Sequence, residues 1–512
     1  MGEIMRIEAN SLTNMLMPER LDILIKYLYI QSYIENKDTK FYLDLYKKHI
    51  ALRTGGEEDH KKNLNDFVQE FNSLIKSIQE NGFDKRYPIP VSIKNGIILN
   101  GAHRLACCLY FQKPIFIEYQ EKTGLKWDYE WFEHHGFQTD LDVVYHKYIQ
   151  LKSKQTFLAI LWGPVEDYWD VIEERISHNF KVIGRLDFSF DKEQFEYIVE
   201  DIYSFEFGVK PTFQILEKIN YLKNFNLVFS VIVFEVVPPQ YLYEKGNPIC
   251  KDVLDLKKSI REELSTIVPV EKFVTIHTSD NPAHTNHIGN ILLNKNNLQT
   301  IKMIRNAKPK KIFLDWLDEF INVLNMHGLK KEDCCIVGSS SLEVLGIRKS
   351  TDIDFILKEE IRDQFFPKEF VKLSTNVDLA SKGYHVKERT ISSFSDDQII
   401  YDQDKHFYFR GIKFASLAII RDRKAFQKRP KDLRDVALID EFLSFSKNKR
   451  IIDLIRKGKN KVVLSFRIHV TSYFKHVILY KVKRLIWNTL SDKQKGKVSQ
   501  ILMKRRGRVK DV

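Results

Sequence analysis

Long uninterrupted apolar runs are missing from this sequence of 512 residues. The first twenty residues, MGEIMRIEANSLTNMLMPER, carry charges where a secretory signal needs an apolar core, so we expect no signal peptide. Hydrophobic residues make up 43% of the chain and charged residues 29%, which is the balance of a globular protein. Composition therefore excludes a polytopic membrane protein and a wholly disordered chain.

Cysteine and glycine are also scarce. The five cysteines are too few and too irregularly spaced for a disulfide framework or a cysteine zinc site. The 21 glycines exclude a collagen-like repeat. An intracellular, reducing compartment fits this composition best, and we expect a cytoplasmic protein.

The net charge of +13 invites a nucleic-acid interpretation, but the charge is unevenly distributed. Residues 447–512 hold 20 Lys and Arg against 3 Asp and Glu, whereas the rest of the chain holds 61 against 65. The basic character thus belongs to one tail. Because the rest is mildly acidic, nucleic acid is disfavoured as a partner.

Within that tail, residues 461–487 mix apolar and aromatic residues with basic ones, which predicts an amphipathic helix. Such a helix could lie on an anionic membrane, each basic residue adding about 1 kcal/mol, and would place the protein at the inner face of a membrane. The alternative is a helix packed on the preceding domain with a solvated basic face. RNA binding is a weaker third option, because no stacking motif accompanies the charge.

The remaining pattern predicts a multidomain α+β chain. Residues 1–80 have the three-to-four spacing of helices, and short strands are expected at IPVSIKN and IILN before residue 101. Strands and helices alternate between residues 155 and 297, and a linker is expected at NNLQTIKMIRNAKPKK. We therefore divide the chain into residues 1–150, 151–297, 298–446 and 447–512.

The most specific motif is CCIVGSSSLEVLGIRKSTDIDFIL, in which an apolar strand ends at Gly338-Ser339 and a second strand carries Asp352 and Asp354. Side chains two apart in a strand share one face, so both carboxylates can bind one or two Mg²⁺ ions. A Gly-Ser turn at a helix N-terminus offers N–H groups and a hydroxyl to a triphosphate. A DxD pair alone also occurs on solvated edge strands, but the spacing of fourteen residues from Gly338 to Asp352 favours a site.

This motif resembles the nucleotidyltransferase superfamily of DNA polymerase beta, which implies Mg²⁺ and a nucleoside triphosphate (ATP or CTP) as cofactors. The resemblance implies a third carboxylate, a base or metal ligand, for which Asp378 is the best candidate. It also implies a following helical segment, in which Lys424, Arg429 and Lys431 could neutralise phosphate charge.

The segment PIPVSIKNGIILNGAHRLACCLYF opens a helix at Gly101. Gly101 allows close backbone approach, and His103 and Arg104 could donate to a phosphate; alternatively both are ordinary exposed residues of the first helical turn. The segment resembles the ParB/sulfiredoxin fold, whose relatives include small-molecule kinases. A catalytic base for a kinase cannot be selected from the sequence.

Two segments of the middle region, TFLAILWGPVEDYWDVIEERISHNFKVIG and FVTIHTSDNPAHTNHIGNILL, resemble nucleoside diphosphate kinase. This resemblance implies a ferredoxin-like αβ sandwich, with His277 as the phosphorylated histidine and Arg261 as a phosphate ligand. Other residues replace three active-site residues of that family here: the lysine that binds phosphate, an asparagine, and the glutamate that orients the histidine. A structural His277 in a domain with changed chemistry is the alternative.

Together these resemblances imply a phosphoryl and nucleotidyl transferase that activates a sugar, polyol or related small molecule, as in bacterial capsule or lipopolysaccharide pathways. Nucleotidylation of a protein or RNA, and a ParB-related nucleic-acid-binding protein with degenerate enzyme folds, are the two alternatives.

Overall fold

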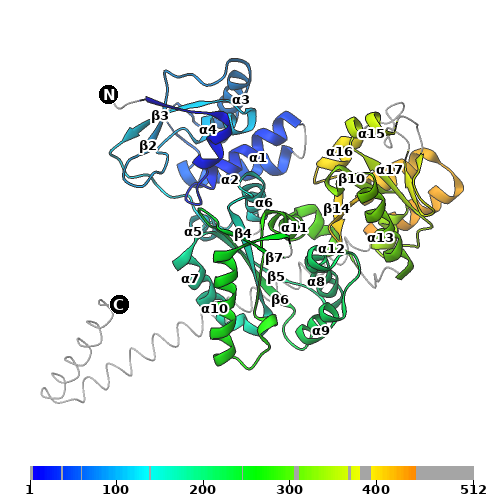
Figure 1. Cartoon of the computed structure of the whole chain (residues 1–512). Coiled ribbons are helices and arrows are strands. Elements are labelled where there is room, and N and C mark those ends of the chain that lie inside the picture. The colour runs from blue at the N-terminus through cyan, green and yellow to red at the C-terminus, as the bar shows by residue number, and fades with distance from the viewer. Residues whose placement is uncertain are drawn as a thin grey trace, which may run out of the picture. The chain divides into compact units, whose positions relative to one another are not determined.

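The computed structural model describes residues 4–35, 39–58, 60–137, 140–244, 246–304, 311–366, 371–380 and 394–444. The chain divides into two compact units, Met1–Leu433 and Arg434–Val512. The first unit holds all the sheets in Figure 1 and has the mixed α+β character expected. Of the second unit, residues 434–444 are described and helical. The predicted amphipathic tail therefore lies outside the described residues.

The N-terminal sheet has three strands in the order β1-β3-β2, in which β3 pairs antiparallel with β1 and parallel with β2. Helix α1 packs against α2 and α4, and α3 also packs against α4. The elements are β1 (Ile4–Ile7), α1 (Asp22–Glu35), α2 (Thr39–Thr54), α3 (Leu64–Asn81), β2 (Ile89–Ser92), α4 (Ala102–Phe111), β3 (Ile115–Gln120), α5 (Tyr129–His134) and α6 (Leu141–Leu151), with the 3-10 helix η1 (Ala9–Met15).

The prediction of a second short strand in this region, at IILN, is wrong. Val91 and Ile98 form a single bridge, and the chain closes a turn with Ser92 N–H donating to the carbonyl of Ile97 at 2.9 Å. The N–H of Leu99 also donates to the carbonyl of Pro90 at 2.8 Å, but pairing stops there, because the side chain of Asn100 accepts from the N–H of Gly101 and helix α4 begins at residue 102. The long partner of β2 is β3, which follows the helix.

The central sheet has four antiparallel strands in the order β5-β6-β4-β9, which is the second, third, first and fourth strand along the chain. Every residue of β4 is buried. Side chains of α7 and α10 pack with β4 and β6 in one hydrophobic cluster, and α11 packs against β4 and α8. The elements are β4 (Thr156–Trp162), α7 (Trp169–Asn179), β5 (Lys181–Ser189), α8 (Lys192–Phe207), α9 (Phe213–Leu222), β6 (Val228–Glu235), α10 (Lys251–Ile267), β9 (Ile276–Thr278), α11 (Pro282–Leu292) and α12 (Lys295–Ile301), with the hairpin β7 (Tyr241–Glu244) and β8 (Asn247–Cys250) and the 3-10 helices η2 (Gly163–Tyr168) and η3 (Lys272–Val274).

The expected linker is also partly wrong, because its first residues form helix α12. The side chain of Asn297 is fully buried, donates to the carbonyl of Ile291 at 2.9 Å and accepts from the N–H of Tyr408 at 2.7 Å. A buried amide with two backbone partners links α12 to the next sheet. The polar composition of this segment gave no sign of that contact.

The third sheet has six strands in the order β12-β13-β11-β10-β15-β14. Its central pair, β10 and β11, is antiparallel, whereas β13 and β15 run parallel to their neighbours in that pair. The elements are α13 (Lys311–Met326), β10 (Cys334–Val337), α14 (Ser340–Val344), β11 (Ile353–Leu357), α15 (Glu359–Phe365), β12 (Val371–Lys372), β13 (Val377–Leu379), α16 (Asp396–Tyr401), β14 (His406–Phe409), β15 (Ile412–Ala415) and α17 (Leu417–Gln427), with the 3-10 helix η4 (Lys331–Asp333).

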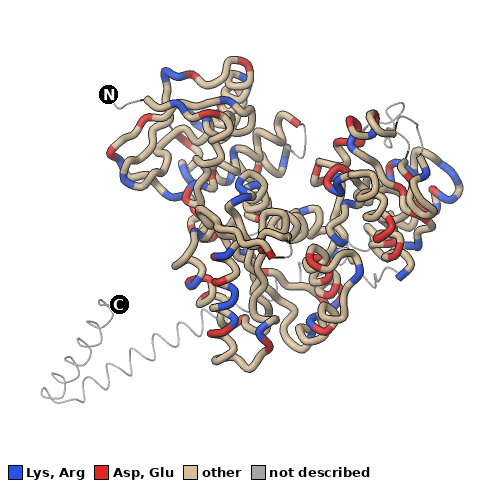
Figure 2. Tube along the Cα trace, in the orientation of Figure 1, with Lys and Arg blue, Asp and Glu red and all other residues tan. Residues whose placement is uncertain are grey.

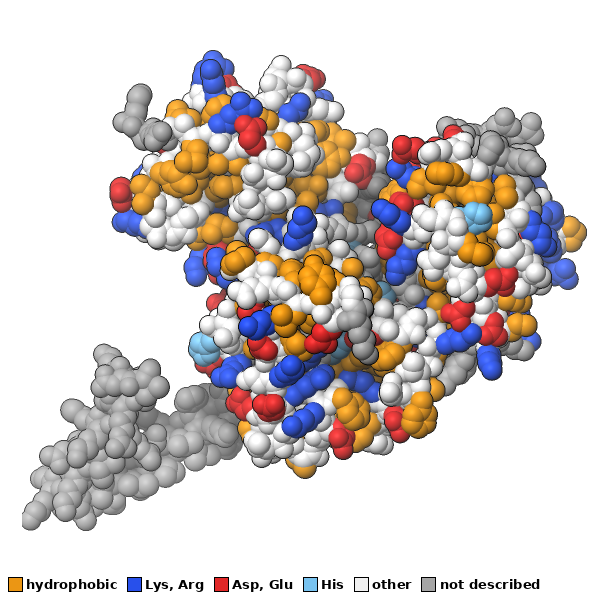
Figure 3. Space-filling model, viewed as in Figure 1, with side chains coloured by type: hydrophobic (Ala, Val, Ile, Leu, Met, Phe, Trp, Pro, Cys, Tyr) orange, Lys and Arg blue, Asp and Glu red, His pale blue; other side chains and the backbone are white. Residues whose placement is uncertain are grey.

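Charges of both signs are interspersed along the described chain, as Figure 2 shows. On the face visible in Figure 3, hydrophobic side chains lie in small groups between charged ones. No helix among the described residues is long and apolar enough to cross a membrane.

Candidate functional site

The first candidate site lies where β10 ends. Gly338 has φ +73°, and a Cβ there would lie 3.0 Å from Oδ2 of Asp354. Residue Val337 pairs with Asp354 across the antiparallel β10–β11 ladder. Glycine is therefore required twice at this position, for the left-handed backbone and for the close approach of the carboxylate.

Three serines fix the backbone before β11. The hydroxyls of Ser340 and Ser350 donate to the carbonyl of Asp352 at 2.9 and 2.8 Å. The Ser339 hydroxyl bonds that of Ser350 at 2.8 Å, and the buried Glu343 accepts from the N–H of Ser350. Asp352 itself stands directly before the strand, so the expected DxD pair spans the strand start. The sequence reasoning missed Ser350 and Glu343, which hold Asp352 in place.

The structure brings all three predicted aspartates to one end of the sheet. Asp378 pairs with Asp354 across parallel strands, which are about 4.8 Å apart. Burial, followed by the negative charges of Asp352 and Asp378, raises the pKa of Asp354 to about 6. Burial and the charge of Asp352 also raise the pKa of Asp378, whose Oδ1 is buried without a hydrogen-bond partner among the described residues. Like charges thus repel in a site that lacks enough local compensation.

The predicted cations lie near this cluster. The positive charges of Lys424 and Lys431 lower the pKa of Asp354 and partly offset its burial and its acidic neighbours. Lys424 Nζ lies 3.3 Å from Oδ1 of Asp432, and Arg429 also binds that fully buried carboxylate. Asp432 therefore orients Lys424 and Arg429.

The second candidate site is a cavity of about 130 Å³ beside Gly101 at the N-terminus of α4. Gly101 adopts φ +89°, and His103 also lines the cavity. His103 accepts or donates at Nε2 to the Tyr46 hydroxyl at 3.0 Å. Burial and then nearby positive charges hold the pKa of His103 well below its usual range, so its ring is neutral. Arg104 donates to the carbonyl of Tyr87.

Three cations that sequence reasoning missed line the same cavity: Arg20, Lys26 and Arg53. Arg20 and Lys26 both bind the buried carboxylate of Asp22, at 2.7 and 2.8 Å. Burial lowers the pKa of Lys26 to about 8. Arg53 pairs with Glu58 at 2.8 Å, while its Nε is buried without a hydrogen-bond partner among the described residues. A cavity with excess positive charge beside a helix N-terminus favours an anion.

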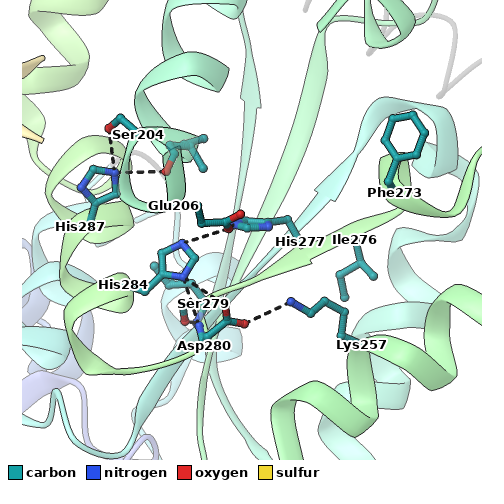
Figure 4. A network of polar contacts seen from close by, with 12 residues as sticks. Ser204, Glu206, Lys257, Phe273, Ile276, His277, Ser279, Asp280, His284 and His287 are labelled. Atoms are coloured by element: carbon teal, nitrogen blue, oxygen red, sulfur yellow. Dashed lines mark hydrogen bonds and ion pairs between the residues drawn. The ribbon is translucent and has the colours of Figure 1, made fainter. Parts of the chain in front are cut away.

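The third candidate site contains His277 on β9. Its side chain is 4% exposed, and its Nε2 lies 3.7 Å from Oε1 of Glu206 on α8. His284 on α11 approaches the same oxygen at 3.9 Å, so the three residues form one cluster in Figure 4. Arg261 donates to the carbonyl of Ile276 at 2.8 Å. Sequence reasoning missed Glu206 and His284, although the spacing of His284 and His287 on one helix was a signal.

The three clusters differ in the distances between their ligand-type groups. Only Glu206, His277 and His284, among the described residues, bring three ligand-type groups within 4.8 Å of one another. The aspartates of the third sheet are coupled by charge but stay further apart. A cavity of about 860 Å³, lined by residues such as Lys152, Phe180 and Glu235, shares no lining residue with any of the three clusters.

No protein-family model matches this chain, and no curated protein or solved structure shows significant similarity to it.

Proposed function

We propose that this protein is a multidomain transferase that moves a nucleotidyl group from a nucleoside triphosphate to a small acceptor. The carrying observation is the bend at Gly338, which lets Asp354 lie against the backbone beside a second aspartate on the neighbouring strand. The match of this geometry to the expected strand–Gly-Ser–helix–DxD order supports a nucleotidyltransferase of the DNA polymerase beta type.

The residues present fit Mg²⁺. Oδ1 of Asp378 is buried without a hydrogen-bond partner among the described residues, and burial, followed by repulsion from Asp352 and Asp378, raises the pKa of Asp354. A cation would therefore stabilise both carboxylates. Asp352 and Asp354 would hold Mg²⁺, which supplies charge neutralisation for the triphosphate and its pyrophosphate leaving group.

The chain's own groups then divide the work. Lys424 and Lys431 would pair with phosphate oxygens and orient the triphosphate for in-line attack. Asp378 would accept the proton of the acceptor hydroxyl or complete the metal site.

The other regions support a second phosphate-handling step. Because the cavity beside Gly101 collects Arg20, Lys26 and Arg53, the ParB/sulfiredoxin-like interpretation of residues 1–150 gains a binding site for a phosphorylated substrate. The strand order of the central sheet, in a β-α-β-β-α-β sequence with insertions, supports a ferredoxin-like domain for residues 151–297. His277 as phosphoryl acceptor is the remaining candidate role there.

We favour a sugar, polyol or related metabolite as acceptor, in bacterial capsule or lipopolysaccharide synthesis, with the basic tail at an anionic membrane surface. Toxin-like nucleotidylation of protein or RNA is the alternative. A ParB-related nucleic-acid-binding protein is disfavoured by the acidic balance outside the tail.

The test is pyrophosphate release from labelled ATP and CTP with Mg²⁺ and a library of phosphorylated sugars and polyols, read by mass spectrometry. We expect release that Asp354→Asn removes and that Asp363→Asn, an exposed carboxylate on α15, leaves unchanged. Label on protein or tRNA would support the alternative. Equal release by both variants would overturn the proposal.

A further inference from the structure

Glu206, His277 and His284 come from three elements and meet in the central domain. Glu206 ends helix α8, His277 lies on β9 and His284 lies in the first turns of α11. Figure 4 shows the carboxylate of Glu206 beside both imidazole rings. Oε1 of Glu206 lies 3.7 Å from Nε2 of His277 and 3.9 Å from Nε2 of His284. These distances are too long for hydrogen bonds.

Both ring nitrogens that face the carboxylate are unsatisfied. Among the described residues, Nε2 of His277 and Nε2 of His284 are buried without a hydrogen-bond partner, and the two side chains are 4% and 0% exposed. Leaving a buried polar atom unpaired costs about 1–3 kcal/mol. Two such nitrogen atoms that face one carboxylate indicate a metal ion bound by all three groups, because a metal ion accepts electron pairs from each of them.

The surrounding contacts hold the rings in this orientation. The His284 ring stacks on Phe205, with centroids 4.6 Å apart and planes 9° from parallel. Its other nitrogen, Nδ1, accepts from the backbone N–H of Asp280 at 3.3 Å and lies 3.8 Å from Oδ2 of the same residue. If Nε2 bound a metal, the ring proton would have to move to Nδ1, where it would face that carboxylate. The His277 ring packs against Tyr203 at 4.6 Å. A carboxylate behind a histidine is the usual arrangement around a bound transition metal.

The donor set and the spacing select the metal. Two imidazoles and one carboxylate suit zinc, whereas magnesium and calcium prefer oxygen alone. With bonds of about 2.0–2.1 Å, ligand atoms of tetrahedral zinc lie about 3.4 Å apart. The two distances to Glu206, 3.7 and 3.9 Å, exceed this value by a few tenths of an ångström, and all three ligand atoms lie within 4.8 Å of one another.

Three basic side chains surround the cluster and bear on what could occupy a fourth coordination position of the metal. Lys257 pairs with Asp280 at 3.2 Å, Arg261 donates to the carbonyl of Ile276, and Lys218 donates to that of Phe273. All three cations act electrostatically on His277. They oppose a bare cation, but they favour a metal that carries an anion.

We propose that Glu206, His277 and His284 bind zinc and leave one coordination position for an anion such as phosphate. Three protein ligands with an open position are the pattern of reactive rather than purely structural zinc sites. A histidine that binds zinc through Nε2 cannot be phosphorylated on that atom. The zinc site and a phosphoryl-acceptor role for Nε2 of His277 therefore exclude each other.

The test is zinc content and affinity of the full-length protein, by elemental analysis and by competition with a chromophoric chelator, with visible spectra after cobalt substitution. The variants are Glu206→Gln, which changes a partly exposed side chain, and His284→Gln. The matched control is His287→Gln, because His287 lies on the same helix with its Nε2 2.9 Å from the carbonyl oxygen of Asp201, outside the cluster.

We expect one zinc per wild-type chain and per His287→Gln chain, and a tetrahedral cobalt spectrum. Glu206→Gln should weaken binding by more than the roughly 10–100-fold that loss of an outer-shell partner costs. Equal affinity in Glu206→Gln and wild type, absence of uptake at micromolar zinc, or phosphate attached to Nε2 of His277 would overturn the proposal. None of these readouts depends on nucleotidyl transfer.

Discussion

Replacing Gly338 by alanine tests the geometry on which the nucleotidyltransferase proposal depends. The new methyl carbon meets Oδ2 of Asp354 at 3.0 Å, so the carboxylate must shift by a few tenths of an ångström. The backbone at φ +73° adds strain of about 1–2 kcal/mol for a residue other than glycine. The variant should therefore be slightly less stable and should hold its metal-binding carboxylate out of position.

Gly328 supplies the matched control. It also has a positive φ, +64°, but a Cβ there meets nothing within 4 Å. Gly328→Ala should lose the same stability, about 1–2 kcal/mol, and keep the carboxylates undisturbed. The comparison separates backbone strain from displacement of Asp354.

The assay is binding of Mg²⁺ and a non-hydrolysable ATP or CTP analogue by calorimetry, together with pyrophosphate release. Since misplacement of a reacting group by about 1 Å can cost 100-fold, a shift of a few tenths should cost roughly tenfold in turnover. We expect this loss in Gly338→Ala and unchanged turnover in Gly328→Ala. If both variants turn over equally, the carboxylate beside Gly338 does not position the nucleotide.

Three further outcomes follow from buried ionisable groups. The phosphate affinity of the N-terminal cavity should fall as the pH rises through about 8, because burial lowers the pKa of Lys26 to about 8 and Lys26 then loses its charge. In calorimetric titrations at pH 7, Arg53→Gln should also weaken phosphate binding. Burial raises the pKa of Asp201 from 3.8 to about 6, so the ionised carboxylate destabilises the folded state above pH 6. Asp201→Asn should therefore stabilise the protein at pH 8 by on the order of 3 kcal/mol in urea unfolding. This gain should vanish as the pH falls to about 4. All five cysteines are buried, so an aromatic disulfide reagent should react with them only after unfolding, and fast reaction of the native protein would contradict the packing.

Local motifs were predictable because their residues are close in sequence. The strand, bend, helix and strand between residues 334 and 357 lie within one segment of the chain. Strand alternation predicted that Asp352 and Asp354 lie together, but Asp352 stands just before β11, where Ser340 and Ser350 hold its carbonyl. The mixed α+β class is likewise confirmed, since periodicity of 2 and 3.6 residues is a local signal. The failures at IILN and at the expected linker have different causes. A local turn into helix α4 ends the pairing at IILN, whereas the buried amide of Asn297, which contacts Tyr408 in the next sheet, holds the start of the expected linker as a helix.

Clusters assembled across the chain were not predictable. His277 was singled out, but Glu206 is 71 residues earlier, and the helix pattern of α8 gives no reason for its last turn to face β9. Similarly Gly101 was predicted to bind phosphate, whereas Arg20, Lys26 and Arg53 reach the cavity only because α1 and α2 pack beside α4. Packing of helices sets these distances, and a single sequence contains no record of it.

The three clusters share no residue. Each contains a buried atom without a hydrogen-bond partner among the described residues: Oδ1 of Asp378, Nε of Arg53, and Nε2 of both His277 and His284. Each should therefore be stabilised by its own ligand, with Mg²⁺ and nucleotide, phosphate and zinc raising the unfolding temperature separately. At a hundredfold excess over its Kd, one ligand adds about 2.7 kcal/mol to the free energy of unfolding of the part that binds it. Independent sites predict additive effects in calorimetry with pairs of ligands, because perturbations without shared partners add. A second ligand that produced no further rise would mean that two of the ligands compete for one site, and the separation into three sites would then be wrong.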